Sequence, residues 1–183
     1  MKYEAKAWKE TEGACLRNFK EQAQIDSVNG ALALRPQIEK IIDQIWEEGF
    51  DGIYFIGIGG TYASSMQVEV YMRGRSKLPV FVENAAEFLT TGNKKFTNKS
   101  VVIISSVSGN TKEMVELVDR VHEKGAKVFS FIENPGTILT QPDKQDYLIV
   151  YPMNEQLKFY MVANYLMYKN GEFDDYDLSL IHI

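Results

Sequence analysis

The 183-residue chain has a single cysteine, Cys15, which excludes a disulfide scaffold and a cysteine-ligated metal cluster. No stretch reaches the roughly 18 apolar residues of a membrane-spanning helix, and no apolar signal-peptide segment follows Met1. Basic residues are not in excess either, because the formal net charge is −5. We therefore expect a cytoplasmic protein that is neither an integral membrane protein nor a general nucleic-acid-binding protein.

What the chain does contain suits one packed domain, since 45% of its residues are hydrophobic and 25% are charged. The first part is helix-like: Ile38, Ile41, Ile42 and Ile45 recur with helical spacing, and Gly49 is placed to end that helix. We divide the chain into an N-terminal helical arm (1–35), a main domain (36–170) and a tail (171–183).

Five short apolar runs then alternate with helix-period segments. The runs are typical of strands buried on both faces: 53–58, 79–82, 101–104, 128–132 and 147–150. The helical segments are 62–73, 111–123 and 157–168. This alternation predicts an α/β fold, namely a three-layer αβα sandwich with a five-stranded parallel sheet, preceded by N-terminal helices.

The last six residues, 178–183, form the segment LSLIHI. They can be encoded by a DNA string that resembles a transposon end used as a sequencing adapter. We expect this hexapeptide to be adapter-derived and the natural protein to continue beyond Asp177; the alternative is a native tail.

The strongest local motif is Ser105 to Thr111, which directly follows the third predicted strand and opens a helix. The hydroxyls of Ser106, Ser108 and Thr111 cluster in one turn, and Gly109 permits a close backbone approach. A helix N-terminus adds free N–H groups and the positive end of a dipole. These features favour a phosphate site, to which Asn110 also belongs, over a simple helix cap.

A second turn, with Gly59, Gly60 and Thr61, follows the first predicted strand. It lacks the third glycine of the dinucleotide fingerprint, because Tyr62 stands there. Ligands of parallel sheets bind outside the carboxyl ends of the strands, so both turns can serve one ligand.

These segments resemble the SIS (sugar isomerase) phosphosugar-binding domains over about residues 38–168. The turn from Gly59 to Tyr62 is similar to the family's C-G-T-S-Y turn, and residues 83–88 (ENAAEF) resemble E-x-A-S-E-F. Residues 106–111 (SVSGNT) resemble S-Q-S-G-E-T, and residues 134–139 (NPGTIL) are similar to N-x-P-x-S-x-L. The resemblance implies that Ser106, Ser108 and Thr111 hold a sugar phosphate, with Thr61 beside them.

Departures from the pattern narrow the subfamily. Val107 stands where glucosamine-6-phosphate synthases have glutamine, and their E-I-G-V-A-S-T-K motif is absent, so that only Glu155 could match its glutamate. The chain looks closer to the N-terminal half of a fructoselysine-6-phosphate deglycase-like protein. The resemblance implies a phosphorylated sugar or glycated-amine 6-phosphate as ligand and a sugar-phosphate deglycase, deaminase or isomerase as the parent enzyme.

In such two-domain relatives the catalytic acid and base come largely from the second half, so no catalytic residue is assigned. We expect this chain to be inactive alone, to lack its second SIS domain and to form a homodimer. No cofactor or metal is expected, because no spacing of His, Asp and Glu suggests a metal site. The alternatives are a non-catalytic phosphosugar-sensing domain and a flavodoxin-like flavin-binding protein.

Overall fold

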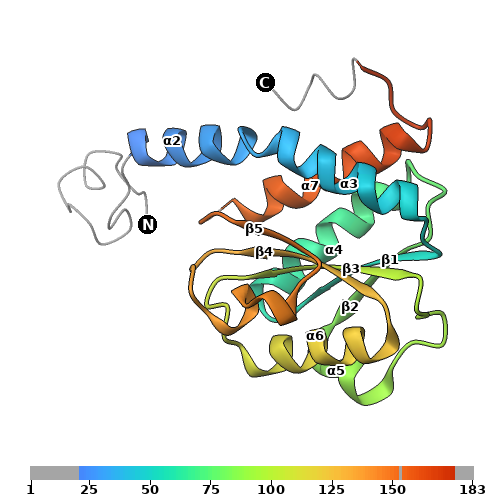
Figure 1. Cartoon of the computed structure of the whole chain (residues 1–183). Coiled ribbons are helices and arrows are strands. Elements are labelled where there is room, and N and C mark those ends of the chain that lie inside the picture. Colours follow the sequence, from blue (N-terminus) through green and yellow to red (C-terminus); the bar gives the residue numbers. More distant parts are fainter. Residues whose placement is uncertain (1–20, 153, 176–183) are drawn as a thin grey trace, which may run out of the picture.

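The computed structural model describes residues 21–152 and 154–175. In these ranges, β1 (Gly52–Gly57), β2 (Val80–Asn84), β3 (Ser100–Ser106), β4 (Lys127–Ile132) and β5 (Tyr147–Val150) form one parallel sheet in the order β2-β1-β3-β4-β5. Its helices are α2 (Glu21–Leu32), α3 (Arg35–Glu48), α4 (Gly60–Arg73), α5 (Ala85–Thr91), α6 (Lys112–Lys124) and α7 (Glu155–Lys169), with short 3-10 turns at η1 (Ile138–Thr140) and η2 (Pro142–Lys144). The predicted α/β sandwich is confirmed (Figure 1).

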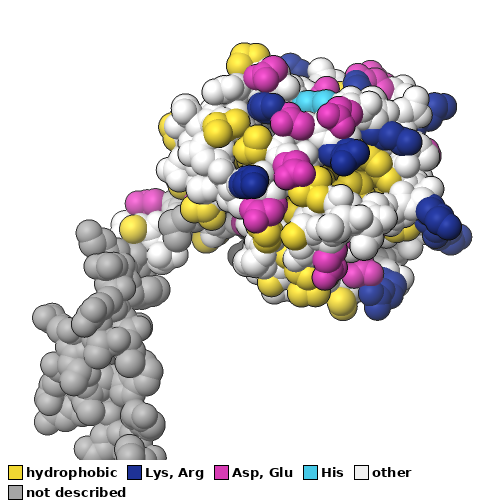
Figure 2. All heavy atoms as spheres, turned by 90° about the horizontal axis from the view of Figure 1, so that it is seen from below, with side chains coloured by type: hydrophobic (Ala, Val, Ile, Leu, Met, Phe, Trp, Pro, Cys, Tyr) yellow, Lys and Arg dark blue, Asp and Glu magenta, His cyan; other side chains and the backbone are white. Residues whose placement is uncertain are grey.

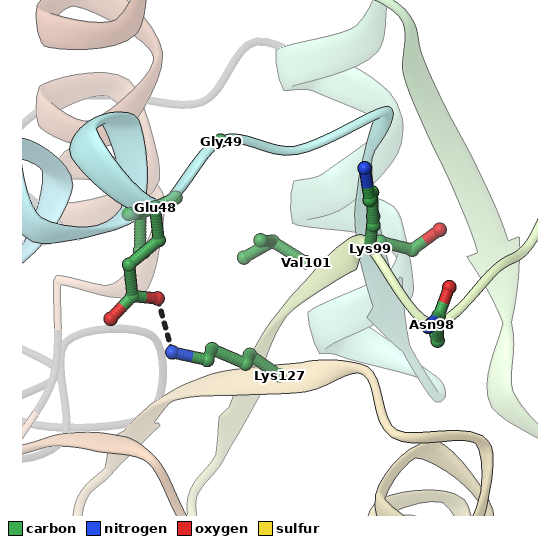
Figure 3. A pocket seen from close by; sticks show the side chains of 8 residues that line it. Glu48, Gly49, Asn98, Lys99, Val101 and Lys127 are labelled. Atoms are coloured by element: carbon green, nitrogen blue, oxygen red, sulfur yellow. Dashed lines mark hydrogen bonds and ion pairs between the residues drawn. The ribbon is translucent and has the colours of Figure 1, made fainter.

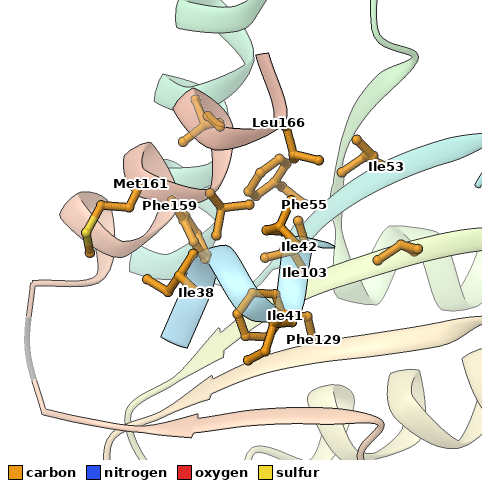
Figure 4. Close-up of a cluster of buried hydrophobic side chains, with 14 of the residues drawn as sticks. Ile38, Ile41, Ile42, Ile53, Phe55, Ile103, Phe129, Phe159, Met161 and Leu166 are labelled. Carbon is orange, nitrogen blue, oxygen red and sulfur yellow. The ribbon is translucent and has the colours of Figure 1, made fainter. Parts of the chain in front are cut away.

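Helices cover both faces of the sheet because the strands are apolar on both sides. In β1, Ile53 and Phe55 face α3, α4 and α7, whereas Tyr54 and Ile56 face α5 and α6. Strands β3 and β4 alternate in the same way, which gives two cores (Figure 4 shows the first). Four isoleucines of α3 enter that first core, as their spacing predicts: Ile38, Ile41, Ile42 and Ile45.

Local signals set the ends of the helices. Pro36 lies in the first turn of α3, and Gly49 ends that helix with φ of 74°. The sequence did not predict α5. This helix begins where the side chain of Asn84 accepts hydrogen bonds from the N–H groups of Ala86 and Glu87. With only seven residues, α5 is too short to show a helical period.

The order of the strands creates a switch point. From β1 the chain crosses to β2 on one side and then returns to β3 on the other. The connections that leave β1 and β3 therefore run to opposite faces of the sheet: α4 packs in the first core and α6 in the second. A crevice between such diverging connections is where ligands of open parallel sheets bind.

The N-terminal region is docked onto the domain from Ser27 onward. The hydroxyl of Tyr151, after β5, donates to the carbonyl of Ser27 at 2.9 Å, and the side-chain amide of Asn154 donates to the Ser27 hydroxyl at 2.6 Å. Gly30 leaves room for Tyr151, because a Cβ there would lie 1.9 Å from the phenol oxygen. The predicted boundary at residue 35 falls where α3 begins, just after α2.

The surface mixes charges of both signs. On the face that carries α5 and α6, acidic and basic side chains are interspersed with small apolar areas (Figure 2). Among the described residues, no helix is long and apolar enough to cross a bilayer. The same residues include no group of three or more His, Cys, Asp or Glu side chains that could hold a metal ion. Cys15 and the hexapeptide 178–183 lie outside the described ranges.

Candidate functional site

A cavity of about 330 Å³ opens at the switch point, beyond the carboxyl ends of β1 and β3. Both turns singled out in the sequence contribute to it. Five of the eight predicted ligand-binding residues line it, namely Gly60, Thr61, Ser106, Ser108 and Thr111. The other lining residues are Ile58, Ser105, Val107 and Met114. The structure therefore brings the two turns together at one cavity.

The β1–α4 turn is closed by the side chain of Thr61. Its Oγ1 accepts a hydrogen bond from the N–H of Ile58 at 2.9 Å and donates to the carbonyl of the same residue at 3.0 Å. A hydroxyl has one proton, so Thr61 can offer a ligand its backbone N–H but not its side-chain proton while the turn is closed. Gly59 permits the turn, with φ of 59°.

The β3–α6 turn contains a short network of hydroxyls. Ser106 Oγ accepts from the N–H of Gly109 at 3.0 Å, and Ser108 Oγ accepts from the N–H of Asn110 at 3.2 Å. The oxygens of Ser108 and Thr111 are 3.0 Å apart and share one proton. The proton of Ser106 and one proton of the Ser108–Thr111 pair remain available to a ligand.

Gly109 and Asn110 do not line the cavity but fix the turn against the loop after β4. The side-chain oxygen of Asn110 accepts from the N–H of Ile138 at 2.9 Å. A Cβ on Gly109 would lie 2.0 Å from Thr137 Oγ1, and its φ is 64°. Glycine at position 109 therefore permits this close contact with the loop, and its predicted approach to a ligand stays a prediction.

Two helix N-termini lie beside the cavity. α4 begins at Gly60 and α6 at Lys112, and the first N–H groups of each have no partner within the helix. Their dipoles favour an anion. None of the nine residues that line the cavity is charged, so within the lining an anion is attracted by these backbone groups and by the free hydroxyl protons.

Sequence reasoning missed four lining residues: Ile58, Ser105, Val107 and Met114. Ile58 was assigned to the first predicted strand, and Ser105 and Val107 lie within the Ser105–Thr111 motif but were not named as ligand-binding residues. Met114 and Ser105 are 1% exposed. Met114 belongs to the buried face of α6, and its spacing of one helical turn from Thr111 is the signal that could have placed it here.

The remaining candidate groups lie elsewhere. Glu155 opens α7 and does not line the cavity. The Nε2 of His122 is 3.1 Å from a carboxylate oxygen of Asp146, which also accepts from the N–H of Val128 at 2.8 Å. His122 therefore links α6 to the segment before β5.

A second hollow, of about 300 Å³, lies at the amino ends of the strands (Figure 3). Glu48 forms an ion pair with Lys127 across it and accepts from the Tyr147 hydroxyl. The ion pair holds the pKa of Glu48 below its usual range. Because the carboxylate and the Lys127 ammonium already satisfy each other, we take the cavity at the carboxyl edge as the candidate site.

Comparison with known proteins identifies the family. The family model described as SIS domain matches residues 50–169. This chain belongs to the SIS domain family. The match covers all five strands and both turns of the cavity.

Individual relatives are distant and mostly longer. The glutamine–fructose-6-phosphate aminotransferase (isomerizing) of Fusobacterium nucleatum is 25% identical over 138 residues, which is 69% of this chain and 23% of that enzyme. A proposed phosphosugar isomerase from Salmonella typhimurium LT2 has a TM-score of 0.73 at 24% identity and covers 81% of this chain and 48% of that one.

Another solved structure is a chain of about the same length as this SIS domain protein. An Escherichia coli protein solved in complex with A5P has a TM-score of 0.58 at 16% identity and covers 90% of this chain and all of that one. At these identities the structural neighbours establish the fold alone. This chain spans about half of the Salmonella neighbour and about a quarter of the curated aminotransferase.

Proposed function

We propose that this SIS domain binds a phosphorylated sugar or amino-sugar derivative in the cavity between the β1–α4 and β3–α6 turns. The observation that carries the proposal is the convergence of two helix N-termini and several hydroxyls on one cavity. Such groups together form a site for a phosphate dianion, because charge-assisted hydrogen bonds are worth about 1.5–3 kcal/mol each.

The relatives described above support this assignment. They include aminotransferases that act on fructose 6-phosphate and a fold neighbour solved with A5P. We infer further that the chain serves as the N-terminal half of a sugar-phosphate deglycase, deaminase or isomerase, with a second SIS domain as its partner and a homodimer as its assembly.

Catalysis in such enzymes moves a proton between neighbouring carbons and needs a general base and a general acid. No Asp, Glu, His or Lys is among the residues that line the cavity. The proposal therefore assigns ligand binding to this domain and the proton transfer to the second domain. It also means that the chain alone should not turn over a sugar phosphate.

Thermal unfolding in the presence of three ligands tests the proposal, because a ligand that binds only the folded state raises its stability. Fructose 6-phosphate should raise the unfolding midpoint more than inorganic phosphate does, and flavin mononucleotide should not raise it. Thr90→Ala removes an exposed hydroxyl on α5 that does not line the cavity, and it should keep the wild-type response. A response to flavin mononucleotide alone would replace this proposal with the flavin-binding alternative.

A further inference from the structure

The lining of the cavity is divided between polar and apolar groups. Hydroxyls and helix N-termini account for the polar part, which the proposed phosphate uses. Three apolar side chains make up the rest: Ile58 from the β1–α4 turn, Val107 from the β3–α6 turn and Met114 from the first turn of α6. A phosphate alone would leave Ile58 and Val107 uncovered, whereas Met114 is already buried by the protein.

Val107 is the most unusual member of this group, because its side chain is 54% exposed in a turn of polar residues. Its backbone is fixed from the neighbouring loop: the side-chain amide of Asn134 donates to the carbonyl of Val107 at 2.7 Å. The preceding residue is held as well, since the carbonyl of Ser106 accepts from the N–H of Glu133 at 3.1 Å. Val107 therefore cannot withdraw into the core, and a ligand that covers it removes apolar surface from water.

Ile58 is fixed in the same manner. The Thr61 hydroxyl bonds to both its N–H and its carbonyl, which fixes the backbone of Ile58, and its side chain packs against the second core. Met114 lines the cavity and belongs to the second core. It is 1% exposed, so it supports the neighbouring side chains and offers little surface of its own to a ligand. We call Ile58, Val107 and Met114 the apolar wall.

We propose that the apolar wall makes the site selective for phosphorylated sugars whose part next to the wall is uncharged and partly apolar, such as an N-acylated amino sugar. This inference rests on the proposed phosphosugar binding and deepens it. A second charge on the ligand, such as the ammonium of a free amino sugar, would lose water at the wall without gaining a partner, since no lining residue is charged. An acyl methyl group placed on the wall instead gains by its burial.

Calorimetric titration at about pH 6.5, where a sugar amine is protonated, compares N-acetylglucosamine 6-phosphate with glucosamine 6-phosphate. We expect the acetylated ligand to bind at least about fourfold more tightly, the factor that corresponds to one buried methyl group. Val107→Thr replaces one methyl with a hydroxyl of similar size and should lower this affinity ratio by about two- to fourfold. Val107→Ala should lower it in the same direction.

Val70→Thr makes the identical change at a valine on α4 that is 65% exposed and does not line the cavity, and it should leave the ratio unchanged. Equal binding of the two ligands, or a ratio that Val107→Thr and Val107→Ala leave unaltered, would overturn the selectivity assigned to the apolar wall. The proposed phosphosugar binding would not be affected by that result. If neither phosphorylated ligand binds, the proposed function itself falls.

Discussion

Hydrogen bonds within the two turns occupy some of the hydroxyl protons, which leaves few of them for a ligand. Thr61 donates to a backbone carbonyl, and Ser108 and Thr111 share one proton between them. Ser106 instead accepts from a backbone N–H and keeps its own proton. The sequence could predict that these side chains gather at a helix N-terminus. It could not predict their hydrogen-bond partners, because these depend on the fold of each turn.

This arrangement predicts unequal effects of substitution on phosphosugar affinity. Ser106→Ala removes a free donor and should weaken binding by about ten- to a hundredfold, the value of one charge-assisted hydrogen bond. Ser108→Ala alone should weaken binding less, because the hydroxyl proton of Thr111 is then free to reach the ligand. Thr111→Val should have a similarly small effect, because it leaves the proton of Ser108 free. Calorimetry on the two single variants and the double variant completes a double-mutant cycle. The double variant should lose more binding free energy than the two single variants lose in sum. Strict additivity would contradict the shared proton.

At the scale of elements, the sheet and its main helices follow from patterns that depend on neighbours in sequence. Continuous apolar runs predicted the five strands, and the isoleucines of α3 predicted its buried face. The docking of α2 could not be predicted in this way. Its contacts join Ser27 and Gly30 to Tyr151 and Asn154, more than a hundred residues away, and no periodicity reports such a contact.

The contact between Gly30 and Tyr151 can be tested by a pair of substitutions. Alanine favours a helix interior over glycine by about 1 kcal/mol, yet Gly30→Ala should destabilise the protein by about 1–3 kcal/mol, because its Cβ meets the phenol oxygen. Tyr151→Phe removes that oxygen, so the same change should cost clearly less in the Tyr151→Phe background. Urea unfolding of the four proteins gives both numbers. An equal cost in both backgrounds would show that α2 is not docked on Tyr151.

At the scale of the whole molecule, a buried lysine links stability to pH. Lys158, in α7, is 0% exposed, and its Nζ donates to the carbonyl of Tyr151 at 2.9 Å. Burial lowers the pKa of Lys158, and the nearby carboxylates of Glu133 and Glu155 offset part of this effect. Sequence reasoning had no signal for it, because lysine within a helix is usually exposed.

The sign of the pH effect follows from proton binding. Between the lowered pKa of folded Lys158 and the usual value of about 10.4, the unfolded chain binds more protons, so Lys158 makes the free energy of unfolding rise with pH. Burial also raises the pKa of Tyr54 and Tyr165 to about 12, which opposes this rise above the usual tyrosine range. Lys158→Met should therefore reduce the increase of the free energy of unfolding with pH, at pH values below the usual tyrosine range. Denaturant unfolding at several pH values measures this slope, with Lys124→Met, the same change at an exposed lysine of α6, as the control. A slope that Lys158→Met leaves intact would assign the effect to another group.

The central claim is that a phosphosugar binds between the β1–α4 and β3–α6 turns, and backbone amide NMR during a titration with fructose 6-phosphate tests it most directly. The largest shift changes should fall on the amides of residues 58–61 and 106–112, which surround the cavity. The amides of Gly49, Lys99 and Lys127, at the hollow on the opposite edge, should stay in place. Changes concentrated at that hollow, or none at either edge at millimolar ligand, would contradict the account.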